Sequence, residues 1–217
     1  MGNITRSFAN NITTSGVLLP ASLNNNSIAN VTDYNAAIAT GGMKLISTQT
    51  ASNSASLSFT TGIDSTYKEY QFWFVDIHAR TDVDNFIFNM STDGGSNYNV
   101  TKTTTSFVAY HDEADTTGAL AYSAGTDLAQ STGFQTISDA LGNLSDESLV
   151  GTISLFNPSS TTYVKHFVQN VNLNSYHNYS INYYNAGYAN TTSAINAVQF
   201  KMSSGNFDGT ILMYGIK

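Results

Sequence analysis

The chain has 217 residues, enough for one large β-sandwich or barrel domain, and it carries a net charge of −7. Only 11% of its residues are charged, which is less than half of the ~25% usual in soluble domains. It has eight Lys and Arg residues in total and no basic stripe to neutralise phosphates, so we expect no nucleic-acid partner. The absence of cysteine excludes disulfides, thiolate metal ligands and cysteine nucleophiles. No apolar run approaches the ~20 residues of a membrane-spanning helix, so we expect no membrane association.

Residues 1–42 differ from the rest of the chain because they are rich in Asn, Ser, Thr and Ala and nearly free of charge. They show neither a helical period nor the long apolar stretch of a signal peptide. Such a segment fits a loose leader, or an arm that becomes ordered on a neighbouring subunit. Its spaced apolar side chains favour the arm, because a solvated tail needs no such anchors. We predict that the arm contacts neighbouring subunits through Phe8, Ile12, Leu18, Leu19 and Ile28.

From Met43 onward, short runs of β-branched and aromatic residues recur at even spacing between turns of Gly, Asn, Asp and Ser. We expect strands at about 43–48, 55–60, 69–79, 84–90, 97–110, 133–138, 148–156, 162–172, 180–188, 194–202 and 208–216. Outside 133–138, residues 111–147 have little strand character, and we expect long loops there. The pattern predicts an all-β protein, in which residues 43–217 form a single jelly-roll-like β-sandwich domain behind an extended N-terminal arm.

Several of these strands alternate between apolar and polar residues, which identifies the side that faces the core. The expected core residues are Phe86, Phe88, Met90, Ile153, Leu155, Val198, Phe200 and Met202. Glycine supplies the positive φ of a tight turn. On that basis Asp93–Ser96 is predicted to join two strands, and Ser203–Asn206 with Asp208–Gly209 to close the last hairpin.

The strand at 69–79 holds the only Trp and is apolar on both faces, so both faces must be covered. Tyr70, Phe72 and Phe74 share one face, and Trp73, Val75 and Ile77 share the other. One set fills the sandwich, and the other needs a second subunit or another part of the chain. We take Tyr70, Phe72 and Phe74 as the candidate oligomer face.

The sequence holds no catalytic constellation, and we predict a protein that is not an enzyme and needs no metal or cofactor. The acidic stretch at 111–115 offers oxygen ligands that suit Ca²⁺, but carboxylates in loops are more often solvated. Asp76 and Asp84 resemble the paired carboxylates of a glycosidase, as do carboxylates in many β proteins. The four histidines form no metal-binding or catalytic pattern.

Tyrosines interleaved with Asn gather near the C-terminal end of the chain. Such amphipathic rings suit a surface that binds sugar or protein, and they also suit a sandwich core or a subunit interface, which we favour. The cluster consists of Tyr176, Tyr179, Tyr183, Tyr184 and Tyr188.

A series of turn-and-strand motifs resembles structural proteins of marine tailed bacteriophages, of the virion decoration and fibre type. The motifs are Ser91–Tyr98, Phe156–Ser160, Ala186–Tyr188, Asn190–Thr192, Phe200–Asn206 and Gly209–Ile216, with Ser7–Asn11 resembling the start of their arms. The resemblance implies a virion protein that forms a homotrimer and has no catalytic residues. The expected function is a capsid decoration or cement protein that contacts the major capsid protein. The alternatives are a tail or head fibre component that contributes to host receptor binding, and a carbohydrate-active enzyme.

Overall fold

The computed structural model describes residues 42–217, which form twelve strands and no helix. The predicted arm contacts Phe8, Ile12, Leu18, Leu19 and Ile28 lie outside the described residues. Within residues 42–217, no helix is long and apolar enough to cross a lipid bilayer. The all-β prediction is confirmed.

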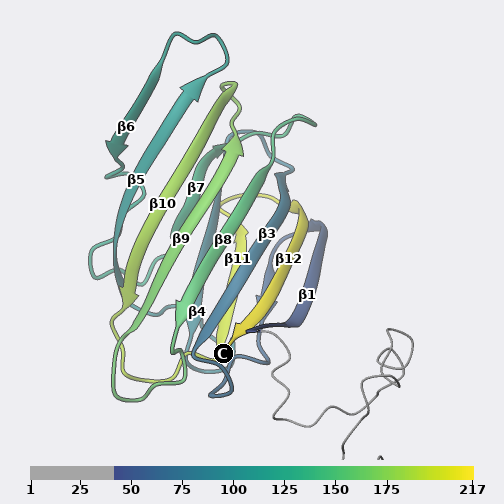
Figure 1. Cartoon of the computed structure of the whole chain (residues 1–217). Helices are drawn as coiled ribbons and strands as arrows, with labels where there is room; N and C mark the ends of the chain where they lie inside the picture. The colour runs from purple at the N-terminus through teal and green to yellow at the C-terminus, as the bar shows by residue number, and fades with distance from the viewer. Residues whose placement is uncertain (1–41) are drawn as a thin grey trace, which may run out of the picture. The chain divides into compact units, whose positions relative to one another are not determined.

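The strands form two antiparallel sheets (Figure 1). They are β1 Met43–Ser54, β2 Leu57–Phe59, β3 Glu69–Ala79, β4 Asp84–Ser91, β5 Lys102–Asp112, β6 Gly118–Tyr122, β7 Gln135–Leu141, β8 Leu149–Phe156, β9 Lys165–Asn174, β10 Tyr179–Ala189, β11 Ala197–Met202 and β12 Phe207–Ile216. The eight-stranded sheet has the order β1-β12-β3-β8-β9-β10-β5-β6, and the four-stranded sheet has the order β2-β11-β4-β7.

The strand order contains a complete jelly roll. The sets β1-β12-β3-β8 and β2-β11-β4-β7 form two four-stranded halves, and the chain passes back and forth between them. This is the arrangement of a double-sheet jelly roll, so the predicted fold class is confirmed. Two inserted hairpins, β5–β6 and β9–β10, widen only the first half, because β9 pairs with β8 and β10 pairs with β5.

The core between the two sheets is aromatic. Phe200 in β11 has five phenylalanine rings within 6.1 Å between centroids, from both sheets: Phe59, Phe72, Phe74, Phe86 and Phe88. Each fully buried side chain of this size contributes roughly 1.5–3 kcal/mol relative to exposure. The core residues predicted from alternation are all buried.

The predicted oligomer face on β3 is wrong. Tyr70, Phe72 and Phe74 are 0%, 1% and 2% exposed and fill the core. Trp73 and Val75 carry the outer side instead, with 39% and 40% of their surface exposed.

Ile77 was expected beside Trp73, yet it is fully buried. A bulge causes this change of side: Asp76 has a φ of 50°, and Gly209 opposite has a φ of 127°. The register of β3 shifts against both β8 and β12 at this point. Gly209 therefore lies within β12, opposite the bulge of β3, and not in a turn, which corrects the prediction for Asp208–Gly209.

The predicted hairpin at the end of the chain is also wrong, although its turn exists. Ser203–Asn206 connects β11 to β12, and these strands lie in different sheets. Asp93–Ser96 likewise leads from β4 in one sheet to β5 in the other, with Gly94 and Gly95 at positive φ. In the segment expected to be loops, β6 forms a strand, and β7 extends to Leu141.

Two lysines are buried without a carboxylate partner. The Lys102 ammonium donates to the carbonyls of Val100 and Gly133 at 2.9 and 2.6 Å. Lys165 donates in the same way to Thr191 and Ser193. Each ammonium ties loop backbone to the start of its strand, and burial lowers the pKa of both groups.

Candidate interaction sites: a sheet face and a cleft

The outer side of the eight-stranded sheet presents aligned rows of side chains. Antiparallel register sets one outward residue of each strand beside the next, and the middle row runs Tyr122, Phe107, Tyr184, Asn170, Thr152, Trp73, Leu212 and Thr48. The row on one side is Thr105, Ala186, Val168, Ser154, Gln71, Tyr214 and Leu45, and the row on the other is Leu120, Ala109, Asn182, Asn172, Val150, Val75, Thr210 and Thr50. We call these three rows the sheet face.

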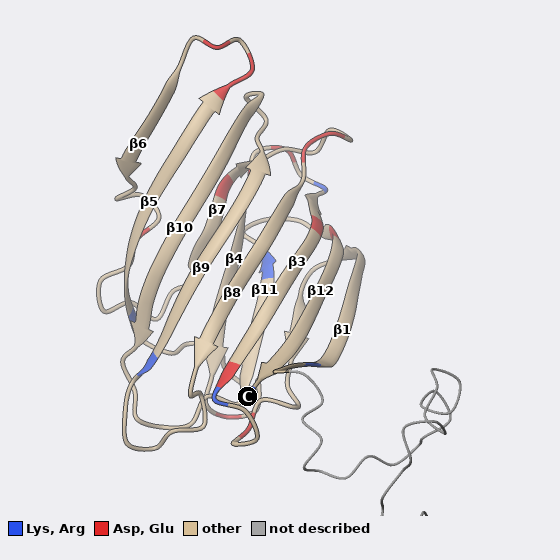
Figure 2. Cartoon of the chain, viewed as in Figure 1, with Lys and Arg blue, Asp and Glu red and all other residues tan. Residues whose placement is uncertain are grey.

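None of the residues in these three rows is Lys, Arg, Asp or Glu, although a carboxylate lies at the margin, where Glu69 accepts a hydrogen bond from Ser154 at 2.7 Å. Charged residues in its eight strands lie near the strand ends, as Figure 2 shows: Lys44, Glu69, Asp76, Lys102, Asp112, Lys165 and Asp208. Most of the exposed large apolar side chains in residues 42–217 lie on this face: Leu45, Trp73, Val75, Phe107, Leu120, Tyr122, Val150, Val168 and Tyr184. Natural sheets normally use charged side chains to prevent unwanted association. A surface that combines these exposed apolar side chains with no charge is a candidate interaction site.

Aromatic side chains on the sheet face are held in place by one another. Phe107 and Tyr184 stack with ring centroids 4.8 Å apart and an interplanar angle of 13°. The rings of Trp73 and Tyr214 pack with their centroids 5.4 Å apart. Trp73 also donates its indole N–H to Gln71 Oε1 at 2.6 Å. Such fixed side chains lose less entropy when a partner binds.

A cleft opens where the widened sheet extends beyond β7, the last strand of the smaller sheet. Its volume is about 610 Å³, within the ~300–1,000 Å³ usual for ligand sites. The lining comes from β4, β5, β7, β10 and nearby loops: Val83, Asn85, Val108, Tyr110, Thr117, Ser123, Asp139, Ala140, Tyr176, His177, Tyr179, Ile181 and Tyr183. We call this space the tyrosine cleft.

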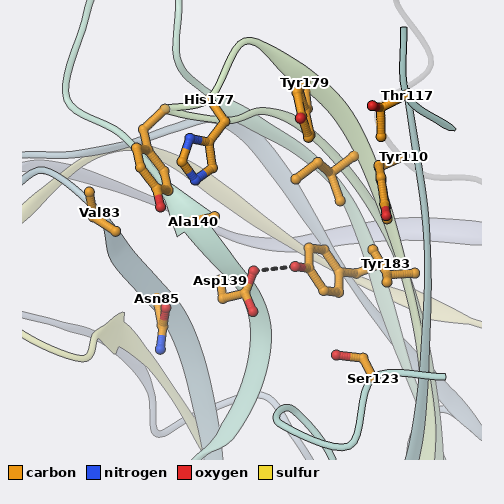
Figure 3. Close-up of a pocket in the computed structure, with 13 residues that line it drawn as sticks. Val83, Asn85, Tyr110, Thr117, Ser123, Asp139, Ala140, His177, Tyr179 and Tyr183 are labelled. Carbon is orange, nitrogen blue, oxygen red and sulfur yellow. Dashed lines mark hydrogen bonds between the residues drawn. The ribbon is translucent and has the colours of Figure 1, made fainter. Parts of the chain in front are cut away.

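Aromatic rings and one carboxylate define the chemistry of the tyrosine cleft (Figure 3). The rings of Tyr110 and Tyr179 are nearly parallel, with an interplanar angle of 7° and a distance of 5.8 Å between their centroids. His177 lies across the space from Tyr110. Tyr183 donates a hydrogen bond to Asp139 Oδ1. Burial, and then this bond to a carboxylate, raise the pKa of the Tyr183 hydroxyl, which keeps it a donor.

A bulge in β7 sets the position of Asp139. Asp84 pairs with Leu141 and Phe86 pairs with Ser138, so β7 has one more residue than β4 over this interval. Ala140 in the bulge has a φ of 60°, a conformation that alanine rarely adopts. Bulges near functional sites commonly redirect a side chain, and this one includes Asp139 and Ala140, which both line the cleft.

The acidic stretch at 111–115 covers the last two residues of β5 and the start of the turn to β6. Asp112 accepts hydrogen bonds from the backbone of Thr116 and Thr117, both at 2.8 Å, and from the Thr116 hydroxyl. These bonds lower the pKa of the Asp112 carboxyl and occupy its oxygens. Residues 42–217 bring no three His, Asp or Glu side chains together as a metal site.

The candidate pair Asp76 and Asp84 does not line the tyrosine cleft. Asp84 is buried and accepts hydrogen bonds from Ser203 and from the backbone and hydroxyl of Ser204. It anchors the turn between β11 and β12. Asp76 is exposed at the bulge of β3.

The predicted tyrosine cluster divides between the two sides of the sheet. Tyr176, Tyr179 and Tyr183 line the tyrosine cleft, while Tyr184 is part of the sheet face and Tyr188 lies on the same side beside His166. Asp139 and Tyr110 were not predicted as site residues. Only the bulge and the pairing of β5 with β10 bring them to the tyrosines.

Comparisons of the chain with protein-family models, with curated proteins and with solved structures give no match.

Proposed function

We propose that this chain is a non-enzymatic structural protein of a bacteriophage virion, and that its sheet face packs against neighbouring subunits. The observation that carries the proposal is the absence of charge from three rows of outward side chains across eight strands. The phage setting rests on the motif resemblance described above.

The size of the sheet face supports an interface. Strands ~4.8 Å apart and rows ~7 Å apart give this patch an area of roughly 700 Å². A standard interface buries ~800 Å² on each partner. The sheet face is therefore large enough to form most of one stable interface.

The leading role is capsid decoration, in which homotrimers add contacts between capsid subunits. Uncharged sheet surfaces suit this role because contacts between uncharged side chains are not screened by salt, whereas exposed ion pairs are. The alternative is a fibre component that joins tail or fibre proteins.

Cryo-electron microscopy of purified particles tests this proposal. A decoration protein is expected in many copies across the head, with its eight-stranded sheet against neighbouring protein. A few copies at the tail or at a fibre base would favour the fibre alternative. Particles that lack the protein, or particles in which the sheet face is open to solvent, would overturn the proposal.

A further inference from the structure

The two inserted hairpins build a space that the jelly roll itself does not require. The eight jelly-roll strands already form two matched four-stranded halves. The strands β10 and β5 lie beyond the edge of the smaller sheet, and three of their inward side chains, Val108, Tyr110 and Tyr179, are only partly covered. Tyr110 and Tyr179 on these strands are half-buried, whereas Tyr183, beside β7, is buried.

Among the described residues, no further strand pairs with the outer edge of β7. Gln169 donates to the carbonyl of Ile137 at 2.7 Å, and Asn185 donates to the carbonyl of Thr136 at 2.9 Å. These amides take the place of a neighbouring strand and hold β7 beneath β9 and β10. The cleft beside them therefore has a fixed wall.

The polar groups of the cleft are only partly used. Tyr183 occupies Asp139 Oδ1, and no donor in residues 42–217 bonds to Asp139 Oδ2. The side-chain amide of Asn85 makes no hydrogen bond within the same residues, and it too lines the cleft. The site thus offers an acceptor, an amide and hydroxyl groups beside aromatic rings.

The charge of the lining decides among ligand classes. Neither Lys nor Arg lines the cleft, and its one formally charged group is the carboxylate of Asp139. Phosphates, sulfates and carboxylated sugars would meet repulsion with no compensating cation. A neutral pyranose fits the lining, because its C–H faces pack on aromatic rings and its hydroxyl edges hydrogen-bond to carboxylate and amide groups.

We propose that the tyrosine cleft binds a neutral saccharide, with sugar rings against Tyr110 and Tyr179 and hydroxyl groups on Asp139 and Asn85. The site is preorganised, because the β7 bulge and the Tyr183 hydrogen bond fix Asp139 before a ligand arrives. Binding there does not depend on the sheet face or on a place in a virion.

The test starts with the full chain on an array of neutral, sialylated and sulfated glycans. Calorimetry with cellotetraose, maltotetraose, chitotetraose and mannotetraose then gives affinities. Binding to at least one neutral glycan is expected. Tyr179→Ala and Asp139→Leu should each weaken binding at least tenfold. Tyr163→Ala is the matched control: Tyr163 is 70% exposed in the loop between β8 and β9, outside the cleft, and its removal should leave the affinity unchanged.

Chemical-shift mapping on the unmodified protein provides a second measurement that does not depend on how the variants fold. Addition of the bound tetrasaccharide should perturb amides at 108–110, 139–140 and 176–183. No binding to neutral glycans, binding to anionic glycans alone, perturbations confined to other residues, or affinity unchanged in both folded variants would each overturn the proposal.

Discussion

The rings of Phe107 and Tyr184 stack on the outer side of the sheet, at 4.8 Å between centroids. They belong to the inserted strands β5 and β10, whereas Trp73 and Tyr214 form a similar contact on β3 and β12 of the jelly roll. The sheet face is therefore continuous across the inserted hairpins and the jelly-roll strands. The same insertions that widen this face also build the tyrosine cleft on its inner side.

The neighbouring residues Phe72 and Trp73 should respond in opposite ways to the same substitution. Phe72→Asp places a charge in the aromatic core and removes a buried ring, which costs more than about 4 kcal/mol, so the variant should not fold. Trp73→Asp places the charge on the sheet face, so it should leave the fold intact and break assembly. Circular dichroism and light scattering give the two readouts.

The unmodified chain is the control and should be oligomeric at micromolar concentration. A stable monomer of the unmodified chain, or unchanged assembly in Trp73→Asp, would show that the sheet face is no interface between copies of this chain.

Ala140→Gly should stabilise the protein by about 1 kcal/mol. The positive φ at this position strains any residue with a Cβ, and glycine removes the strain. Ala186 lies in the regular part of β10, where glycine relieves no strain. Ala186→Gly should instead destabilise the protein by ~0.5–1 kcal/mol, because it only raises the conformational entropy of the unfolded chain. Urea denaturation of both variants tests the difference in sign.

Asp84→Ala should destabilise the protein by about 2–3 kcal/mol, because the turn at Ser203 and Ser204 loses its buried acceptor. Asp82→Ala, at an exposed position two residues earlier, should change stability by less than about 0.5 kcal/mol. If purified protein hydrolysed a polysaccharide and Asp84→Asn abolished that activity without a loss of stability, the structural role assigned to Asp84 would be wrong.

Alternation predicted the core residues of β4, β8 and β11 because each of these strands has one apolar side. The same reasoning cannot choose between the sides of β3, because Phe72 and Trp73 are both aromatic. The bulge at Asp76 then moves Ile77 from the outer side of the sheet to the core, and no pattern in the sequence predicts this bulge. β6 was missed because all its residues are exposed, so it has no alternation.

The tyrosine cleft was not predictable for a related reason. Tyr110 and Tyr179 are far apart in sequence and meet only because β5 pairs with β10. Asp139 appeared as an isolated carboxylate near the end of a short predicted strand. Its place in the cleft depends on the β7 bulge, which again leaves no mark in the apolar pattern.

The stability of the protein should depend on pH through Lys102. Burial lowers the pKa of this ammonium from 10.5 to about 8, while the unfolded chain keeps its ordinary pKa. Between these values the unfolded state binds more protons than the folded state, so the contribution of Lys102 to stability rises with pH. Below about pH 8 both states are protonated, and the folded protein bears the full cost of burying a cation.

Lys102→Met removes this titration. The free energy of unfolding of the unmodified protein, minus that of Lys102→Met, should increase by about 2 kcal/mol from pH 7.5 to pH 10. Other titrating groups are common to both proteins and cancel in the difference, as does the fixed cost of leaving the Val100 and Gly133 carbonyls without a donor. Lys68→Met, at an exposed position, should show a flat difference over the same range. Urea denaturation at several pH values measures both, and a flat difference for Lys102→Met as well would mean that the buried ammonium keeps its ordinary pKa.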